Sequence, residues 1–425
     1  MKKGLLLSVV ASTMIFAGGD IAPVEPAAPA SADFWGQIGF SYDANDFDWG
    51  PWTAGLPTSL GDTENNAFST SIVLGVEKEL GYGFGFGFEV AGWTDFGLDI
   101  ADLARVSGEI TPWGSRNQTD AEVSQAYLTY TFGNTAIKAG RQALPAAVSP
   151  WAWSDRSAGV LDITYDALVV ANTDLQDTTI VGAWVANAVN GNSPTHLGDN
   201  DAGIFMLAAI NKSLANTTLT VSGYYFADAA YDIPNIGKVY TVPVGMEDLY
   251  SIWASAVGNM DGITWGLQGA YVDGSSSYKD ATFAIAGKVG STWGDFDATL
   301  VASYINDGDY SLKTAGSGVG TSAFWGNSFG GTFTNGDGIG KDGVTHVRVD
   351  MGYKLSTGKL FGGIGYVDYG SKWLFDNGFG GRIGYKFNVM GVNSKVEYRY
   401  ADYSGQNGVP DLTKQRIRVE AFYKF

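Results

Sequence analysis

Charged side chains that could orient a dissolved solute recur at alternating positions near the C-terminal end of the chain. Within each of four segments the basic residues stand an even number of positions apart, and three acidic residues are interleaved with them. The set comprises Arg348, Asp350, Lys354, Arg382, Lys386, Lys395, Glu397, Arg399, Arg416, Arg418 and Glu420. Residues two apart in a strand share a face, so apolar neighbours such as Val347 and Ile417 would point the other way. Such a charged face can attract and orient ions. The alternative is a solvated surface whose charges balance one another.

The sequence offers little to other kinds of chemistry. It has no cysteine, which excludes disulfides, thiol catalysis and Cys-ligated zinc. Its two histidines, His196 and His346, do not suggest a metal site, and we find no nucleophile and base in a catalytic pattern. We therefore predict no enzyme activity and no cofactor; Ca²⁺ bound by acidic loops is the one metal ion left open. The net charge of -18 makes nucleic acid an unsuitable partner.

The first 32 residues are typical of an export signal followed by a spacer. A basic start, Met1 to Lys3, precedes an uncharged apolar run over 4–17 that is shorter than the ~20 residues of a membrane helix. We predict a signal peptide over 1–19, cleaved before Asp20 with Gly18 as the alternative, and a Pro/Ala-rich spacer over 20–32. A buried N-terminal helix is the competing interpretation. One domain would then cover 33–425.

From residue 33 onward, apolar and polar residues alternate with a period of two. In the clearest case Tyr82, Phe84 and Phe86 face one side, while Gly83 and Gly85 face the other. We predict 18 strands, near 34–43, 67–79, 82–94, 123–132, 135–141, 163–172, 178–187, 204–212, 217–228, 248–257, 262–273, 281–289, 295–305, 345–356, 359–369, 378–389, 394–403 and 412–425. Two of them, 248–257 and 359–369, are ambiguous in phase, so 16 strands is the alternative count.

The connections between these strands alternate between short turns and long polar loops. The long loops are near 43–66, 95–122, 142–162, 188–203, 229–247 and 306–344. Short periplasmic turns and long extracellular loops are the pattern of an outer-membrane barrel, in which the sheet must close because unpaired backbone groups are costly in lipid. Charged residues make up only 16% of the chain, which fits strands with one face in lipid. We therefore predict an all-β fold, a transmembrane antiparallel β-barrel, over a soluble sandwich.

Two segments resemble a known family. The last strand alternates outward to Tyr423 and Phe425, similar to the C-terminal signal that the barrel assembly machinery recognises. The strand-turn-strand over 126–142 and the Ser-Pro-Trp and Ser-Asp-Arg steps over 149–156 resemble the approach to the third loop of 18-stranded porins. That class includes the major outer membrane protein of Campylobacter-type bacteria and, more distantly, the OprD-like channels. The acidic Pro-Glu-Phe-Gly-Gly motif of general porins is absent.

This resemblance implies a constriction and a cellular setting. The third loop, near 142–162, would fold inward and narrow the lumen, with Arg141 at its root and Asp155, Arg156 and Asp162 at the constriction. The alternatives are a third loop that only lies across the mouth of the barrel, and loop 306–344 as the plug. The resemblance also implies a homotrimer in the bacterial outer membrane, surrounded by lipid and lipopolysaccharide.

Three functions compete at this point. A barrel of 16–18 strands leaves an aqueous channel, so the leading prediction is a porin for passive diffusion of ions and small hydrophilic solutes. Acidic loops, including Asp43, Asp46 and Asp48, predict a weak cation preference. The first alternative is an OprD-like specific channel whose basic face guides small carboxylates. The second is a structural or adhesive barrel with a plugged lumen.

Overall fold

The computed structural model describes residues 32–48, 50–52, 60, 66–94, 119–146, 148–150, 163–190, 193–197, 202–229, 247–275, 280–308, 310, 312, 325, 343–369 and 375–425. The predicted signal peptide and most of the predicted spacer lie outside these residues, and so do Asp155, Arg156 and Asp162. No helix in the described ranges is long and apolar enough to cross a membrane.

Strands make up almost all of the regular structure in these ranges. They are β1 (Asp33–Asp48), β2 (Asn66–Gly81), β3 (Phe84–Thr94), β4 (Thr119–Phe132), β5 (Thr135–Gln142), β6 (Thr164–Asn172), β7 (Thr178–Asn190), β8 (Ser193–His196), β9 (Ile204–Asn211), β10 (Thr217–Ala229), β11 (Glu247–Met260), β12 (Ile263–Gly274), β13 (Thr282–Trp293), β14 (Phe296–Ile305), β15 (Val344–Leu355), β16 (Gly358–Asp368), β17 (Phe375–Val389), β18 (Val392–Gly405) and β19 (Leu412–Lys424). A single-turn 3₁₀ helix covers Gly50–Trp52.

Eighteen of the described strands form one closed antiparallel barrel, as the alternating pattern predicts. The remaining strand, β8, has four residues and pairs only with the end of β7, so it extends a hairpin and adds nothing to the circumference. The sequence did not predict it. Strands β11 and β16, whose phase was ambiguous, both belong to the barrel, which removes the 16-strand alternative.

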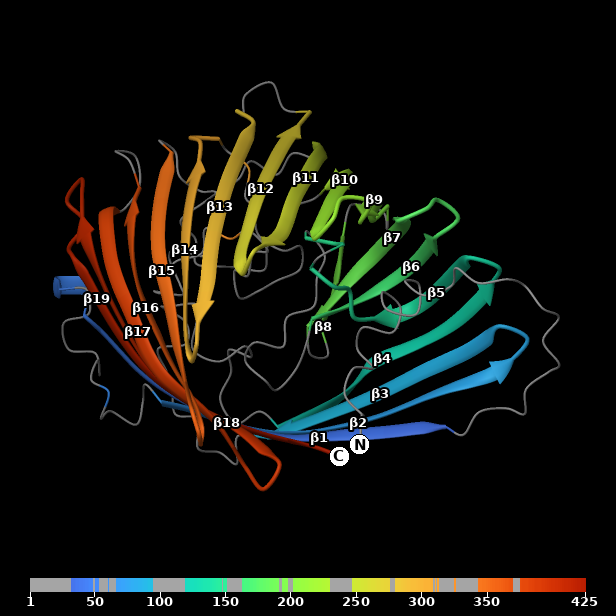
Figure 1. Ribbon diagram of the computed structural model, residues 1–425, viewed down its shortest axis with the longest axis horizontal. Coiled ribbons are helices and arrows are strands. Elements are labelled where there is room, and N and C mark those ends of the chain that lie inside the picture. The colour runs from blue at the N-terminus through green and yellow to red at the C-terminus, as the bar shows by residue number, and fades with distance from the viewer. Residues whose placement is uncertain are drawn as a thin grey trace.

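The barrel closes between its first and last strands. Figure 1 shows the sheet curling from blue β1 through green and yellow to red β19, which returns to β1. Gly36 N donates to Phe425 O at 2.8 Å, and Phe425 N donates back to Gly36 O at 3.0 Å. Closure leaves no unpaired edge, which is the condition for a sheet that spans lipid.

The two ends of the barrel differ in their connections. One end carries only short turns, such as the one at Gly83, where φ is +82° and a Cβ would lie 2.1 Å from Thr131 O, so glycine is required. The other end carries the long loops, but the connections 275–281, 369–374 and 406–411 are short there too. The expected alternation of loop length therefore holds for one end of the barrel and only partly for the other.

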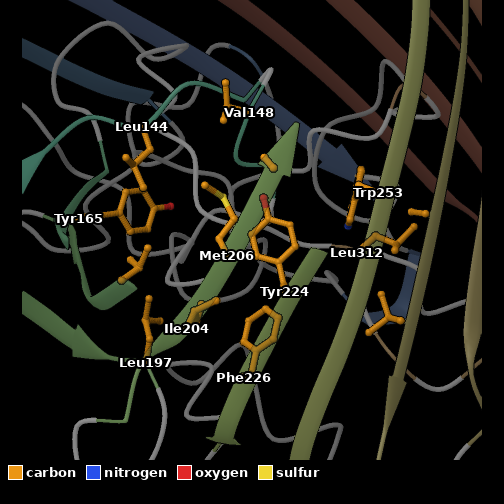
Figure 2. Packing of buried hydrophobic residues seen from close by; sticks show 14 of the residues in the cluster. Leu144, Val148, Tyr165, Leu197, Ile204, Met206, Tyr224, Phe226, Trp253 and Leu312 are labelled. Atoms are coloured by element: carbon orange, nitrogen blue, oxygen red, sulfur yellow. The ribbon is translucent and has the colours of Figure 1, made fainter. Parts of the chain in front are cut away.

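The inner face is not uniformly polar. In β9, Phe205 and Leu207 point outward with 48% and 64% of their surfaces exposed, whereas Ile204 and Met206 point inward with 1% and 6% exposed. We call the buried apolar side chains on the inner face of β6, β7 and β9 to β14 the apolar wall. Loop residues pack on it: Leu144, Val148, Leu197, Tyr310 and Leu312 are buried in the same cluster, and Figure 2 shows most of these side chains converging. One side of the lumen is therefore filled.

Candidate functional site

The basic residues of the C-terminal strands fall into two rows across the inner face of β15 to β19. Strand pairing places Arg382 opposite Arg399, and Arg399 opposite Arg416; we call these three the arginine row. On the far side of Arg382, the row continues through Gly363 to Asp350 on β15. Residues directly opposite in an antiparallel pair have Cβ atoms ~4.5–5.5 Å apart, so the three arginine side chains leave the wall side by side.

A second row lies nearer the short-turn end. Lys354 stands opposite Lys359, Lys359 opposite Lys386, and Lys386 opposite Lys395; we call these four the lysine row. Lys395 then faces Glu420 on β19. Lys359 is absent from the sequence-based set because it is the single charged residue at the start of a glycine-rich strand of uncertain phase. Its alignment with three other lysines depends on strand register.

Carboxylates between and beside the two rows form ion pairs with some of their basic residues. Asp350 accepts from Arg348 Nε and Arg382 Nη2, both at 2.8 Å. Glu420 lies 2.7 Å from Lys395 Nζ and 3.5 Å from Arg418 Nη1, and Glu397 pairs with Arg399 and, at 3.7 Å, with Lys395. Each acid thus bridges two cations in the described part of the wall, which leaves both cations able to exchange partners.

Asp43 is the strongest of these bridges. Arg418 donates to both of its oxygens, Nε to Oδ1 at 2.7 Å and Nη2 to Oδ2 at 3.0 Å, while Arg416 Nε reaches Oδ1 at 2.7 Å. The prediction that Asp43 belongs to an acidic outer loop is wrong. β1 continues to Asp48, and the alternation that buries Gln37 and Ser41 carries Asp43 onto the inner face with 5% of its surface exposed.

The charged wall as a whole carries excess positive charge. It holds the nine basic residues Arg348, Lys354, Lys359, Arg382, Lys386, Lys395, Arg399, Arg416 and Arg418. Its acids are Asp43, Asp297, Asp350, Glu397 and Glu420, where Asp297 lies 2.6 Å from Lys359. Lys354 and Lys386 make no ion pair with the described residues. The Lys386 ammonium lies 5.1 Å from the Phe361 ring centre.

A smaller acidic patch lines β2 to β4 on the other side of β1. Glu77 accepts a hydrogen bond from the Tyr127 hydroxyl, and Lys138 Nζ lies 3.6 Å from the centre of the Tyr127 ring. Glu89 accepts from Ser124 Oγ at 2.5 Å and from Gln125 Nε2 at 3.0 Å. Alternation along β2 and β3 puts Glu77 and Glu89 on the inner face, but nothing in the sequence links isolated acids on separate strands into one patch.

The start of the third loop enters the barrel. Gln125 Oε1 accepts from Ala143 N at 3.2 Å, and Val148 O accepts from Ser222 Oγ of β10 at 2.9 Å. The described residues 143–146 and 148–150 therefore reach both the acidic side of the lumen and the apolar wall. The candidates Asp155, Arg156 and Asp162 follow these residues and lie outside the described ranges.

Arg141 lies on the other side of the barrel wall. Its Nε donates to Asp166 Oδ1 at 2.9 Å. Tyr165 and Ala167, which flank Asp166 in β6, are buried on the inner face, so alternation puts the Arg141–Asp166 pair on the outer face. Arg141 thus does not contribute charge to the lumen.

The C-terminal residues lie at the closing seam. The Tyr423 and Phe425 rings stack on the outer face with centroids 6.0 Å apart. Their role as an assembly signal stays a prediction. No group of three or more His, Cys, Asp or Glu side chains in the described ranges is arranged to hold a metal ion.

Comparisons with known proteins reveal similarity of fold alone. No family model matches the sequence, and no curated protein matches it. The structure is similar to OpdO of Pseudomonas aeruginosa, with a TM-score of 0.65, 13% identity, and coverage of 93% of this chain and 97% of that one. OpdK of the same organism matches with a TM-score of 0.65 and 12% identity, covering 92% of this chain and 99% of that one. OccAB1 of Acinetobacter baumannii matches with a TM-score of 0.64 and 13% identity, covering 92% of this chain and 97% of that one. These are OprD/Occ outer-membrane channels, and the chain has their 18-stranded barrel fold.

Proposed function

We propose that the protein is an outer-membrane channel that guides small carboxylates through its lumen along the arginine and lysine rows. The observation that carries this proposal is the alignment of seven cations in two rows on one wall. Like charges placed directly opposite in a sheet are unfavourable, by roughly the ~0.2–1 kcal/mol that cross-strand pairs contribute. A fold that repeats this arrangement over four strand pairings is better explained by the solute than by stability.

The chemistry of the wall suits transient binding of a carboxylate. A guanidinium group donates two parallel hydrogen bonds to a carboxylate, so the arginine row offers strong first contacts. Conduction also requires release, and the neighbouring Asp350, Glu397 and Asp43 compete with the solute for the same guanidinium groups. Lys354 and Lys386, which have no acid partner in the described residues, would receive the anion next.

One similar structure supports the solute class. A further structure of OpdK from Pseudomonas aeruginosa, 11% identical in sequence to this chain, contains vanillate, and vanillate is a carboxylate. We propose the same chemical class for this chain because its charged wall has the matching charge, and we propose no particular compound.

Weak cation preference is the second candidate function, favoured by the acidic patch at Glu77 and Glu89 and by the net charge of -18. Purified protein in planar bilayers separates the two. A reversal potential in a KCl gradient that indicates anion flow, together with competitive block of the current by benzoate, supports the carboxylate channel. A cation-selective potential with no block by benzoate rejects it, and absence of conductance favours the plugged structural barrel.

The cellular setting belongs to the same proposal. Residues 1–19 would direct export, and the mature barrel would lie in the outer membrane as a homotrimer among lipopolysaccharide molecules, with Ca²⁺ bridging its acidic loops to phosphate groups. Heat-dependent gel migration, chemical cross-linking before heating, and N-terminal sequencing of the mature protein test these points separately. A single monomer band after cross-linking would reject the trimer.

A further inference from the structure

Trp325 is a residue of the long connection between β14 and β15 that lies against the inner face of β12 and β13. Its backbone N–H donates to Gln268 Oε1 at 3.0 Å, and Lys288 Nζ lies 4.0 Å from the centre of its ring. The indole also packs against the cluster on the apolar wall. Trp325 thus reaches two neighbouring strands through its backbone and its ring.

Gly266 provides the space that the indole occupies. A Cβ at this position would lie 2.7 Å from Trp325 Cη2 and 2.9 Å from both Trp325 Cζ3 and Lys288 Cε. The φ angle of Gly266 is not in the left-handed region, so the backbone itself would accept another residue. Glycine is needed here for room. We call Gly266, Gln268 and Lys288 the tryptophan seat.

Tyr310 and Leu312 of the same connection also contact the inner face of the barrel. Tyr310 N donates to Thr282 Oγ1 at 2.9 Å, and Leu312 is fully buried. Thr282 and Gly274, which the Tyr310 hydroxyl approaches, stand at the long-loop end of β13 and β12, whereas the seat lies several residues deeper in the barrel. The described residues of this connection therefore contact one pair of strands at two separate depths.

Strand register places the seat next to the charged wall. Gly266 stands opposite Lys288, Lys288 opposite Val301, and Val301 opposite Arg348. Lys288 forms no ion pair with the described residues, and its ammonium is committed to the face of Trp325. The seat therefore marks the boundary where the filled side of the lumen meets the basic side.

We propose that Trp325 is a positioning residue of the channel, held by the tryptophan seat so that the solute path stays on the charged wall. This inference rests on the proposed channel function for its consequence, but the seat itself can be tested without transport. Loss of the indole frees Lys288 and widens the path on the side away from the arginine row.

The first test uses the absence of cysteine from the sequence. Lys288→Cys introduces a single thiol under the indole, and we compare its modification by a water-soluble methanethiosulfonate reagent with and without Trp325→Ala. We expect Trp325→Ala to raise the labelling rate severalfold. Lys359→Cys on the lysine row, which does not contact Trp325, should label at the same rate in both backgrounds. Equal rates at position 288 with and without the indole would overturn the proposal.

The second test measures conductance. Trp325→Ala and Gly266→Val should both raise single-channel conductance and weaken selectivity between benzoate and chloride, while Gly269→Ala, on the outer face of the same strand, should leave both unchanged. Trp325→Phe should restore part of the selectivity, since a smaller ring can still lie beside Lys288. Lys288→Met removes the cation–π contact with Trp325. It should increase the time that the channel spends in a higher-conductance state by about 2- to 5-fold, the change that a cation–π contact gives.

These outcomes separate the seat from the wider function. If the indole protects position 288 from labelling but benzoate does not block the current, the tryptophan seat is supported and the carboxylate proposal is rejected. Benzoate selectivity that survives Trp325→Ala and Gly266→Val, in protein that shows normal heat-dependent migration, would keep the channel and reject the seat.

Discussion

The two walls of the lumen differ in chemistry although the same alternation builds both. On the apolar wall, inward residues such as Ile204 and Met206 are buried under loop residues such as Leu144 and Leu312. On the charged wall, Lys354 and Lys386 remain exposed. A wall that loops cover needs apolar side chains to pack them, whereas a wall that stays wet can carry charge at little cost. The inner face therefore indicates which part of the lumen is filled.

The largest effect is expected when charge is moved to the filled wall. Ile204→Asp would bury an unpaired carboxylate and should prevent refolding in detergent or lower stability by ~3–5 kcal/mol. Lys354→Asp, which places the same side chain on the charged wall opposite Lys359, should refold normally. The folded fraction, measured from heat-dependent gel migration, checks this. Similar refolding of both variants would mean that the apolar wall is open to water.

The next largest effect concerns the bridge at Asp43. Asp43→Asn leaves Arg416 and Arg418 without their shared carboxylate, so unfolding free energy should fall by ~1–3 kcal/mol, less than for a dry pair because lumen water screens the charges. Anion selectivity should rise at the same time. Urea unfolding in lipid vesicles and reversal potentials report the two effects, with Asp402→Asn at the exposed outer rim as control. An unchanged urea midpoint would show that the bridge is not stabilising.

A functional effect without a stability effect is expected for the unpaired lysines. Lys354→Gln with Lys386→Gln should shift the reversal potential toward cation flow and weaken benzoate block, while the free energy of unfolding in urea stays within ~0.5 kcal/mol of wild type. Lys212→Gln removes the same charge at a short turn outside the lumen and should change neither quantity. Equal shifts from Lys212 and from the lysine row would indicate a general charge effect.

The smallest effect is expected on the acidic patch. Glu122, on the inner face of β4 beside this patch, is buried, and its Oε2 has no hydrogen-bond partner among the described residues. Glu122→Gln should leave stability nearly unchanged and move the reversal potential slightly toward anion flow. A shift as large as that of the double lysine variant would mean that the acidic patch sets selectivity as much as the basic rows do.

The sequence predicts the strands well because one face of each strand is consistently apolar. It predicts the two walls poorly. The run Ile204 to Ile210 is apolar on both faces, so polarity does not reveal which side the loops will cover. The arginine and lysine rows could not be predicted from the sequence either. Each strand supplies its own lysine or arginine, but only the pairing register aligns Lys359 with Lys386. Asp43 was misassigned because an acidic residue near other acids resembled the beginning of a loop.

The seam between β1 and β19 has a consequence for the order of folding. Its pairing joins Gln37 to Lys424, so these contacts bridge nearly the whole length of the barrel. Each doubling of a closed loop adds only ~0.6 kcal/mol of entropic cost, so this distance affects stability little. It affects time more, because contacts between distant residues form slowly. We expect the seam to close last during biogenesis, after every other hairpin has formed, and the C-terminal phenylalanine to take part in that final step.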